Sequence, residues 1–369
     1  MSDGGPSQPY LEQAIRLHAY LCLHHWDGRT LTGPDGGVRF NYRVGRFIKS
    51  YLDFLPWRDA YYYLQAQGYW VLANWRLLDA TGQRRFEDCA IAASRTMLER
   101  QRPDGAWDYP EPEWAGRIAT AEGTWAAMGL LETYRRTGDR VYADGARNWN
   151  EFLQHRVGYS PALGGLAVNY FAVRPGAAVP NNSAFVLRFL SDFALATRDA
   201  TSLGACEGLV HFLAAAQLPS GELPYSVSHN DRRDGTVHFQ CFQYNAFQCI
   251  DLISYFETSG DRTVLPIASR LLEYLRHGMD RSGRPYYNCR QQRRAVVYHA
   301  GAIAAALSAG MRLGIIESDD SPRRAYAWLL GKQRHDGGFP TSFNDYGVLS
   351  DRRSYPRNQT MILLHLLSA

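Results

Sequence analysis

The feature that most restricts the fold of this chain is a phrase of polar, turn-forming and aromatic residues that returns along the sequence. It reads QRPDGAWDYP at 101–110, QLPSGELPY at 217–225 and QRHDGGFPT at 333–341. A stretch with the spacing of an amphipathic helix precedes each copy, and a more apolar helical stretch follows it. A repeat of roughly 50 to 70 residues indicates an array in which no single unit buries its own apolar face.

The helical stretches on the two sides of each phrase differ in polarity. The preceding stretches carry charge along one side, as in YLEQAIRLHAYL at 10–21, whereas the following stretches are apolar nearly all round, as in HAGAIAAALSAG at 299–310. A helix with a polar stripe faces water along that stripe, and a helix that is apolar on all sides is enclosed by protein. The alternation therefore predicts outer helices wrapped around inner ones.

Turn-rich loops separate six such pairs, and six alternating outer and inner helices close naturally into a double-walled ring. We therefore expect an all-α chain that forms one (α/α)6 barrel, or toroid, as a single domain over residues 1–369. A linear solenoid is the alternative, but its terminal repeats would carry a polar outer face. The last segment, MILLHLLSA at 361–369, is largely apolar and favours closure.

The expected helix boundaries follow from apolar spacing and from an ending that the inner helices share, as in RRTGD at 135–139 and ETSGD at 257–261. Glycine can cap a helix at this position. We expect outer helices near 8–26, 84–100, 140–156, 200–216, 262–277 and 321–333. We expect inner helices near 58–80, 117–136, 181–197, 238–258, 295–313 and 355–368.

Composition and charge narrow the functional classes. The net charge is +4 without a block of Lys and Arg, so we expect no nucleic-acid partner. There is no apolar run of about eighteen residues and no signal-like N-terminus, so we expect a cytoplasmic protein without a membrane span. The six cysteines form no CxxC pair and are interpreted as reduced core thiols. We expect neither a metal nor a cofactor, and the oligomeric state stays open.

The repeated phrase itself is interpreted as structural. An Asp-Gly pair supplies a tight turn that accepts a positive φ angle. The aromatic residue that follows can bury against the adjacent hairpin, so Trp107, Tyr225 and Phe339 are expected to join neighbouring helix pairs.

The same topology places a candidate site at one end of the ring. All six loops lead from an outer helix into an inner one, so the N-termini of the inner helices surround one mouth. Exposed N–H groups and helix dipoles favour negative charge there, as on a carboxylate, sulfate or diphosphate. The first turns of the inner helices are polar, whereas their later turns consist of Leu, Ala, Val and Phe.

Polar side chains in these first turns are the candidate site residues. We expect catalytic residues among Glu122, His238, His299, Tyr244 and Tyr298. We expect substrate-binding residues among Tyr61, Tyr62, Gln65, Arg117, Asn181, Asn182, Gln240, Gln243, Asn245, Arg294, Tyr355, Arg357 and Asn358. Structural roles are the alternatives, because Asn181 and Asn182 fit a helix cap, Glu122 a buried ion pair, and His299 a core histidine.

These residue types suit the chemistry of an acidic sugar. Arg117, Arg294 and Arg357 can hold a carboxylate in a bidentate contact. Removal of the proton next to a uronate carboxylate needs a base, an acid and neutralisation of the enediolate. That set serves C5-epimerisation or β-elimination. Hydrolysis is less favoured, because it needs two acting carboxylates and the mouth offers few besides Glu122 and loop acids such as Asp108 and Asp345.

Six hairpins with Gln-x-x-Asp-Gly-aromatic loops resemble the α/α-toroid superfamilies, and the resemblance covers essentially the whole chain. These comprise the six-hairpin glycosidase-like enzymes with the uronate epimerases, and the terpenoid-cyclase and protein-prenyltransferase group. The first branch implies a carbohydrate-active enzyme, of epimerase or lyase type, acting on an acidic oligo- or polysaccharide. The loop pattern is specific for architecture and weak for chemistry.

Two alternatives stay open at this point. A terpenoid cyclase or prenyltransferase would act on an isoprenoid or diphosphate substrate, although the DxDD acid motif of protonating cyclases does not occur here. Asp88 and Cys89 fall on an expected outer helix and are badly placed for the prenyltransferase zinc site. No other cluster has the ligand spacing of that site. A toroid that binds a glycan without turning it over is the other alternative.

Overall fold

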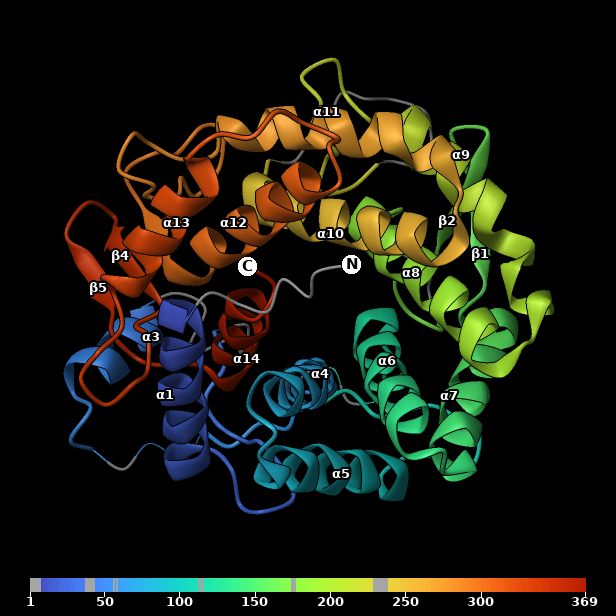
Figure 1. The fold of residues 1–369 in the computed structure, drawn as a ribbon, viewed down its shortest axis with the longest axis horizontal. Coiled ribbons are helices and arrows are strands. Elements are labelled where there is room, and N and C mark those ends of the chain that lie inside the picture. Colours follow the sequence, from blue (N-terminus) through green and yellow to red (C-terminus); the bar gives the residue numbers. More distant parts are fainter. Residues whose placement is uncertain are drawn as a thin grey trace.

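The computed structural model describes residues 8–36, 44–55, 57, 59–111, 114, 116–173, 177–227 and 238–369. Its helices form two concentric rings, and the expected all-α barrel is confirmed (Figure 1). The outer helices are α1 (Gln8–His24), α5 (Arg84–Glu99), α7 (Arg140–Phe152), α9 (Cys206–Ala216), α11 (Leu265–Arg276) and α13 (Ser321–Leu330). The inner helices are α4 (Leu64–Thr81), α6 (Thr120–Thr137), α8 (Pro180–Thr197), α10 (Cys241–Ser259), α12 (Val297–Arg312) and α14 (Pro356–Leu366).

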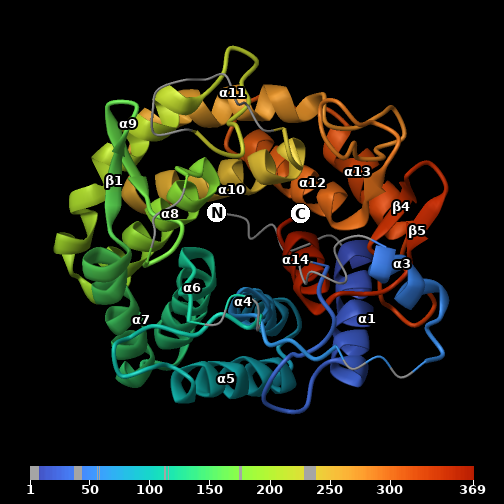
Figure 2. The same cartoon turned by 180° about the vertical axis from the view of Figure 1, so that it is seen from behind.

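The ring is closed by contacts between its two ends, so the linear solenoid is excluded. The last inner helix, α14, packs against α4 and α12 and also contacts α1 (Figures 1 and 2). The side-chain amide of Gln333, which follows α13, donates a hydrogen bond to the carbonyl of Gln13 on α1 at 3.0 Å. In the described residues, no helix has the length and apolar character needed to cross a membrane.

The Gly-Asp pair at the C-terminus of an inner helix, as after α6, terminates that helix and starts the following outer helix. Gly138 follows α6 with a φ of +72°, in the left-handed region that glycine adopts readily, and its N–H donates to the carbonyl of Tyr134. The next residue, Asp139, caps α7 by accepting a hydrogen bond from the N–H of Val141 at 3.2 Å. Two adjacent residues therefore produce the sharp reversal between inner and outer rings.

The glutamine of the repeated phrase binds neighbouring outer helices together. The Gln101 side chain donates to the carbonyls of Gly105, in its own turn, and Gly145, on α7, both at 2.9 Å. Gln217 bonds in the same way to Gly221 and to Ile267 on α11. Gln333 repeats the arrangement with its own turn and α1. Each copy of the repeated phrase thus forms the same joint, a glutamine that bonds both to its own turn and to the next outer helix.

The aromatic residues of the repeated phrase were expected to pack between neighbouring helix pairs, and the buried ones do so. Trp107 and Phe339 are buried, and the Trp107 indole donates to the carbonyl of Met97 at 2.8 Å. The Trp107 ring also packs near Trp149 on α7, with 5.9 Å between ring centroids. Tyr225 is half-buried and contacts Phe239 and Tyr244 instead.

Several short elements and boundaries differ from expectation. The first inner helix was expected from residue 58 but begins at Leu64, because the preceding backbone pairs with an earlier loop through Tyr61 and Gly33. The expected outer helix at 140–156 changes into a π-helical turn at Leu153–Val157. The sequence pattern did not predict the elements in the loops, which are α3 (Val44–Tyr51), β1 (Tyr159–Ala162), β2 (Gly165–Val168), β3 (Ala295–Val296), β4 (Ser342–Asp345) and β5 (Leu349–Asp351).

Four of the loop elements build a wall beside the inner ring. Strands β3, β4 and β5 form a three-stranded antiparallel sheet in that order, in which Ala295 pairs with Phe343 and Ser342 pairs with Asp351. Helix α3 packs against β5. This sheet and helix place charged side chains from distant parts of the chain at the starts of α12 and α14.

Candidate functional site

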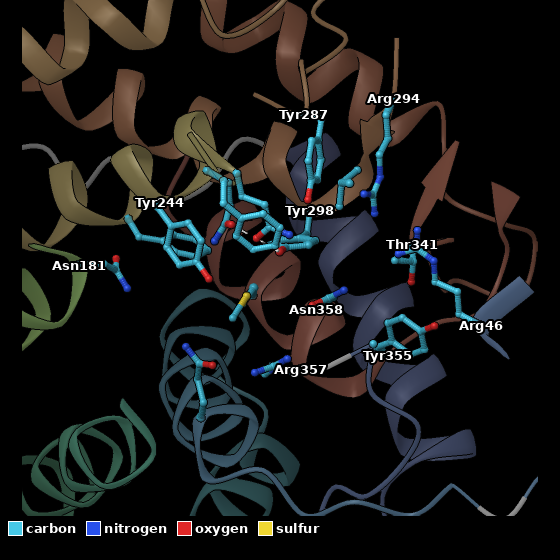
Figure 3. Close-up of a pocket in the computed structure, with 18 of the residues that line it drawn as sticks. Arg46, Asn181, Tyr244, Tyr287, Arg294, Tyr298, Thr341, Tyr355, Arg357 and Asn358 are labelled. Atoms are coloured by element: carbon cyan, nitrogen blue, oxygen red, sulfur yellow. Dashed lines mark hydrogen bonds between the residues drawn. The ribbon is translucent and has the colours of Figure 1, made fainter. Parts of the chain in front are cut away.

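A cavity of about 360 Å³ lies where the inner helices begin. Five of the six inner helices contribute to it, mostly through residues in or next to their first turns. The rest of the lining comes from α3, from the β3–β5 sheet and its adjoining residues, and from loop residues Gly36 and Tyr287. Ten candidate residues line it, namely Gln65, Asn181, Gln240, Gln243, Tyr244, Arg294, Tyr298, Tyr355, Arg357 and Asn358. The clustering of these polar residues at one mouth is therefore what the structure shows (Figure 3).

Two guanidinium groups on one side of the cavity share a buried carboxylate. Asp345 on β4 accepts contacts from Arg294 at 2.6 Å and from Arg46 of α3 at 2.9 Å, and its own side chain is only 1% exposed. The hydroxyl of Ser342 also donates to Asp345. The Arg294 guanidinium lies over the ring of Tyr287 at 4.2 Å. The pair is held rigidly because its counter-ion is enclosed.

A third guanidinium, that of Arg357, lies in the first turn of α14. It donates to Asp35 at 2.7 Å and stacks over the ring of Tyr63 at 4.6 Å from the centroid. The hydroxyl of Tyr63 in turn donates to Glu111. Figure 3 shows Arg357 and Asn358 between the group of Arg46 and Tyr355 and the opposite side of the cavity.

The charges on the cavity wall are therefore positive. The described lining residues comprise three arginines and no Asp or Glu, because Asp345 and Asp35 lie behind the guanidinium groups that they hold. A guanidinium has five N–H donors, more than one carboxylate contact uses. The wall can accept an anionic group of a ligand.

Tyrosine hydroxyls and amides form the opposite side. The Tyr298 hydroxyl, at the start of α12, lies 3.4 Å from the Gln240 and 3.5 Å from the Gln243 amide oxygen. Burial raises the pKa of the Tyr298 and Tyr244 hydroxyls, so both are protonated donors at neutral pH. Aromatic faces beside neutral hydrogen-bonding groups are the features that a sugar ring requires.

Glu122 lies just behind this cavity, in the first turn of α6. Its carboxylate accepts a hydrogen bond from the N–H of Gln65 at 3.0 Å and so caps the N-terminus of α4. Burial raises the pKa of Glu122 to about 7, although Arg357 opposes the shift. The alternative of a direct buried ion pair is not found among the described residues, since the Glu122 carboxylate bonds to the Gln65 backbone instead. Glu122 is not among the residues that line the cavity.

The two candidate histidines lie outside the cavity lining. His299 is fully buried on α12, where the rings of Tyr287 and Tyr298 pack against it, and burial lowers its pKa to about 3. It is therefore neutral at physiological pH. His238, before α10, is paired through Nδ1 with Glu222 at 2.9 Å. Neither imidazole reaches the cavity surface.

The other candidate residues that do not line the cavity lie elsewhere in the fold. The Asn245 amide makes two hydrogen bonds with the backbone of Leu223 and joins α10 to the preceding loop. Asn182 is buried on α8. Tyr61 pairs through its backbone with Gly33, Tyr62 lies beneath the guanidinium of Arg100, and Arg117 stacks on Trp114.

Several lining residues escaped the sequence analysis because they lie outside the inner helices. Arg46 belongs to a short helix in the first loop, Tyr346 to the loop after β4, and Tyr287 to the loop before β3. The Tyr-Tyr pair at 286–287 could have indicated this, because two large aromatic residues in a turn-rich loop are typical of a packing or binding surface. Arg46 had no such signal.

Two clusters have the composition of a metal site. In the described residues, His18, Cys22 and Cys89 form one group, and Glu222, His238 and Cys289 form the other. In each group the ligating atoms lie within 4.8 Å of one another. Neither group lines the cavity.

Comparison with known proteins identifies the fold. No protein-family model and no curated protein matches the sequence. Among solved structures, cellobiose 2-epimerase from Bacillus thermoamylovorans aligns with a TM-score of 0.73 at 12% identity, over 97% of this chain and 99% of the enzyme. The chain has the six-hairpin glycosidase-like α/α-toroid fold.

Other solved toroid structures align with this chain equally well or nearly so. A sugar epimerase from a ruminal bacterium has a TM-score of 0.73 at 9% identity, with 97% of this chain and 98% of that protein covered. A polysaccharide lyase has a TM-score of 0.68 at 10% identity, with 98% and 96% covered. At such low identity, these matches establish the six-hairpin toroid architecture and leave the reaction to be argued from the cavity.

Proposed function

We propose that the chain is a carbohydrate-active enzyme that binds an acidic, uronate-containing glycan in the cavity at the inner-helix N-termini. The observation that carries the proposal is the lining itself: three guanidinium groups, several tyrosines and amide side chains, with no carboxylate among the described lining residues. The solved toroids of similar shape include two sugar epimerases and a polysaccharide lyase, which supports action on a carbohydrate.

The same groups support epimerase or lyase chemistry. Arg294 and Arg46, fixed by one carboxylate, offer two adjacent guanidinium groups to a uronate carboxylate and to the enediolate that forms when its neighbouring C5 proton leaves. The protonated hydroxyls of Tyr298 and Tyr244 can return a proton to C5 in an epimerisation. In an elimination they can protonate the departing C4 oxygen.

The base is the less defined partner in this scheme. Burial raises the pKa of Glu122 to about 7, and Glu122 adjoins the cavity through Gln65. A base is most effective when its pKa is near the working pH. We therefore assign Glu122 as the first candidate for proton abstraction, with a change in the Gln65 contact needed to bring its carboxylate to the substrate.

Hydrolysis is disfavoured by the same lining. A glycosidase that follows the common scheme needs two carboxyl groups, one on each side of the scissile bond. The described lining residues offer none, and Asp345, which sequence analysis named as a possible participant, is occupied by two arginines.

Product analysis tests the proposed activity. The protein is incubated in D₂O with oligomers of uronic acids, with neutral β-linked disaccharides, and with isoprenoid diphosphates. Epimerisation places deuterium at C5 of the uronate, and elimination produces the ultraviolet absorbance of an unsaturated uronate. Turnover of only the neutral sugars would refute the acidic specificity, and turnover of only the diphosphates would refute the carbohydrate assignment. Uronate binding in calorimetry without any product would identify a glycan-binding protein.

A substitution tests the role of the cavity wall. Arg294→Gln removes one guanidinium while Asp345 keeps Arg46 as its partner, so the fold is expected to survive. We expect kcat/KM for a uronate oligomer to fall about 10- to 100-fold, the effect of losing hydrogen bonds to a charged group. Arg293→Gln is the matched control, since Arg293 is the exposed neighbour and does not line the cavity. Equal activity of the two variants would exclude Arg294 from substrate binding.

A further inference from the structure

Three metal-ligating side chains meet away from the cavity, on the outer helices of the first two hairpins. His18 and Cys22 are four residues apart on α1, so they lie on one face of that helix, one turn apart. Cys89 comes from α5. Their ligating atoms all lie within 4.8 Å of one another, and all six cysteines of the chain are free thiols. A structural cluster of soft ligands is thus built from two rigid elements.

The orientation of the imidazole is fixed by a second layer of hydrogen bonds. The Asn74 amide N–H₂ on α4 donates to the carbonyl of Trp70 at 2.9 Å, so its oxygen faces the His18 Nε2 atom at 2.9 Å. Nε2 therefore carries the proton, and Nδ1 keeps a lone pair. The indole of Trp70 stacks on the same imidazole at 4.5 Å. Metal-ligating histidines characteristically donate their other N–H to such an oxygen.

The Cys22 thiol lies beside the His18 imidazole, with its Sγ atom 3.9 Å from Nε2. The distance from His18 Nδ1 to Cys22 Sγ is 3.6 Å. A tetrahedral zinc ion with Zn–S of about 2.3 Å and Zn–N of about 2.0–2.1 Å holds its sulfur and nitrogen ligands about 3.6 Å apart. The helical spacing and the Nδ1–Sγ separation agree with such a site. Because Sγ also lies only 3.9 Å from Nε2, the Cys22 side chain has to rotate for both atoms to bind one ion on the Nδ1 lone pair.

We propose that His18, Cys22 and Cys89 bind a thiophilic divalent metal ion, with Zn²⁺ as the reference, and leave the fourth position to water or an external ligand. Binding releases one proton from each thiol, and the two thiolates balance the charge of the ion while the imidazole stays neutral. This proposal departs from the expectation that the chain binds no metal. The ion would link α1 to α5 and so fasten the first hairpin to the second.

The second cluster supplies an internal comparison. Glu222, His238 and Cys289 combine one soft sulfur with a hard carboxylate, and the histidine Nδ1 is already paired with Glu222 at 2.9 Å. The contact that holds this imidazole is therefore with a potential ligand, not with a separate amide as for His18. Substitution of Cys289 therefore removes a cysteine of similar burial without touching the proposed site.

Cobalt titration tests the proposal on the full-length, reduced and metal-free protein. We expect about one equivalent of Co²⁺ to produce a thiolate-to-cobalt charge-transfer band and the visible bands of a tetrahedral ion. Zn²⁺ should displace the cobalt and raise Tm by a few degrees. Cys22→Ser and Cys89→Ser should each abolish the charge-transfer band or weaken binding more than 100-fold, whereas Cys289→Ser should leave both signals unchanged. Circular dichroism verifies that the variants are folded.

Three outcomes would overturn the assignment. The first is a wild-type protein that gives no charge-transfer band. The second is loss of the band in Cys289→Ser with retention in Cys22→Ser. The third is a protein in which Cys22 and Cys89 form a disulfide as isolated and, once reduced, fail to bind Co²⁺. Asn74→Ala probes the positioning residue, and its Zn²⁺ affinity is expected to fall about 10- to 100-fold with the cobalt band retained.

Discussion

At the scale of single residues, each of the three guanidinium groups in the cavity is held by a buried carboxylate. Asp345 holds Arg294 and Arg46, and Asp35 holds Arg357. This arrangement keeps the charged donors in place without a ligand, which lowers the ordering cost of binding. It also means that a single substitution can affect stability as well as function, so each variant needs a control.

The ionisation of Glu122 predicts a pH dependence of stability. Burial raises its pKa from 4.5 to about 7, so between these values the folded protein keeps a proton that the unfolded chain has lost. The stabilisation from this group is therefore complete below about pH 4.5 and disappears as the pH rises to 7, with a size on the order of 3 kcal/mol. Glu122→Gln stays neutral and keeps an acceptor for the Gln65 N–H, so it should lack this loss.

Urea unfolding at pH 5 and pH 8 measures the difference. The stability of Glu122→Gln relative to wild type should increase between the two pH values by about 2–3 kcal/mol. Glu151, an exposed carboxyl on α7, provides the control, and Glu151→Gln should follow the wild-type curve. If the free energy of unfolding changes with pH equally for Glu122→Gln and wild type, the raised pKa of Glu122 is contradicted.

The sequence identified residue types at the mouth but could not separate neighbours on one helix. Gln243 lines the cavity, whereas Asn245 turns to the loop before α10 and binds the Leu223 backbone. Both are polar, and two positions along a helix correspond to opposite sides of it, so only the packed ring decides which side chain meets the cavity. Arg46 was missed for another reason: its place depends on contacts between α3 and a sheet formed from the far end of the chain.

At the scale of the elements, the joint between outer helices was predictable from its residues. The Gln, the Asp-Gly turn and the aromatic residue each have a local preference, and these preferences agree. The partners of the glutamine were not predictable, because Gly145 and Ile267 lie on the next outer helix, 44 and 50 residues away. The strands β3–β5 were missed because runs of two to four residues carry no usable period.

Two glycines of similar backbone conformation provide a test of the joint. Gly105, in the repeated phrase, has a φ of +86°, and a Cβ atom there would lie 2.3 Å from the carbonyl oxygen of Asn148 on α7. Gly138, after α6, has a φ of +72° and nothing within 4 Å of that position. Gly138→Ala should cost about 1–2 kcal/mol from the left-handed conformation alone. Gly105→Ala should cost about 1–3 kcal/mol more, because the outer helices must separate.

Chemical denaturation of the two variants in parallel gives this difference directly. Because both substitutions replace glycine by alanine at a positive φ angle, their effects on the unfolded chain cancel. Equal destabilisation would show that the close approach of the turn to α7 contributes nothing, and the repeated phrase would then be a turn signal only.

At the scale of the whole molecule, closure of the ring couples the two ends of the chain. Helix α14 contacts α4, α12 and α1, and the Arg76 guanidinium on α4 reaches the carbonyl of Leu364 at 3.4 Å. The apolar last segment predicted this, since an uncapped solenoid would leave MILLHLLSA in water. The cavity depends on the same closure, because Tyr355, Arg357 and Asn358 line it from the last hairpin while Gln65 lines it from the first.

We therefore propose that residues 1–369 form one domain, and we expect one cooperative unfolding transition. Eight of the nine tryptophans precede residue 150, so their fluorescence reports mainly on the first half of the chain, whereas far-ultraviolet circular dichroism reports on all helices. In a closed ring neither half can lose its packing alone, so the two thermal transitions should coincide. Deletion of residues 356–369 removes α14 and should broaden and separate them, as expected for an array that unfolds from its ends. Separate transitions in the intact chain would mean that the ring consists of independent units.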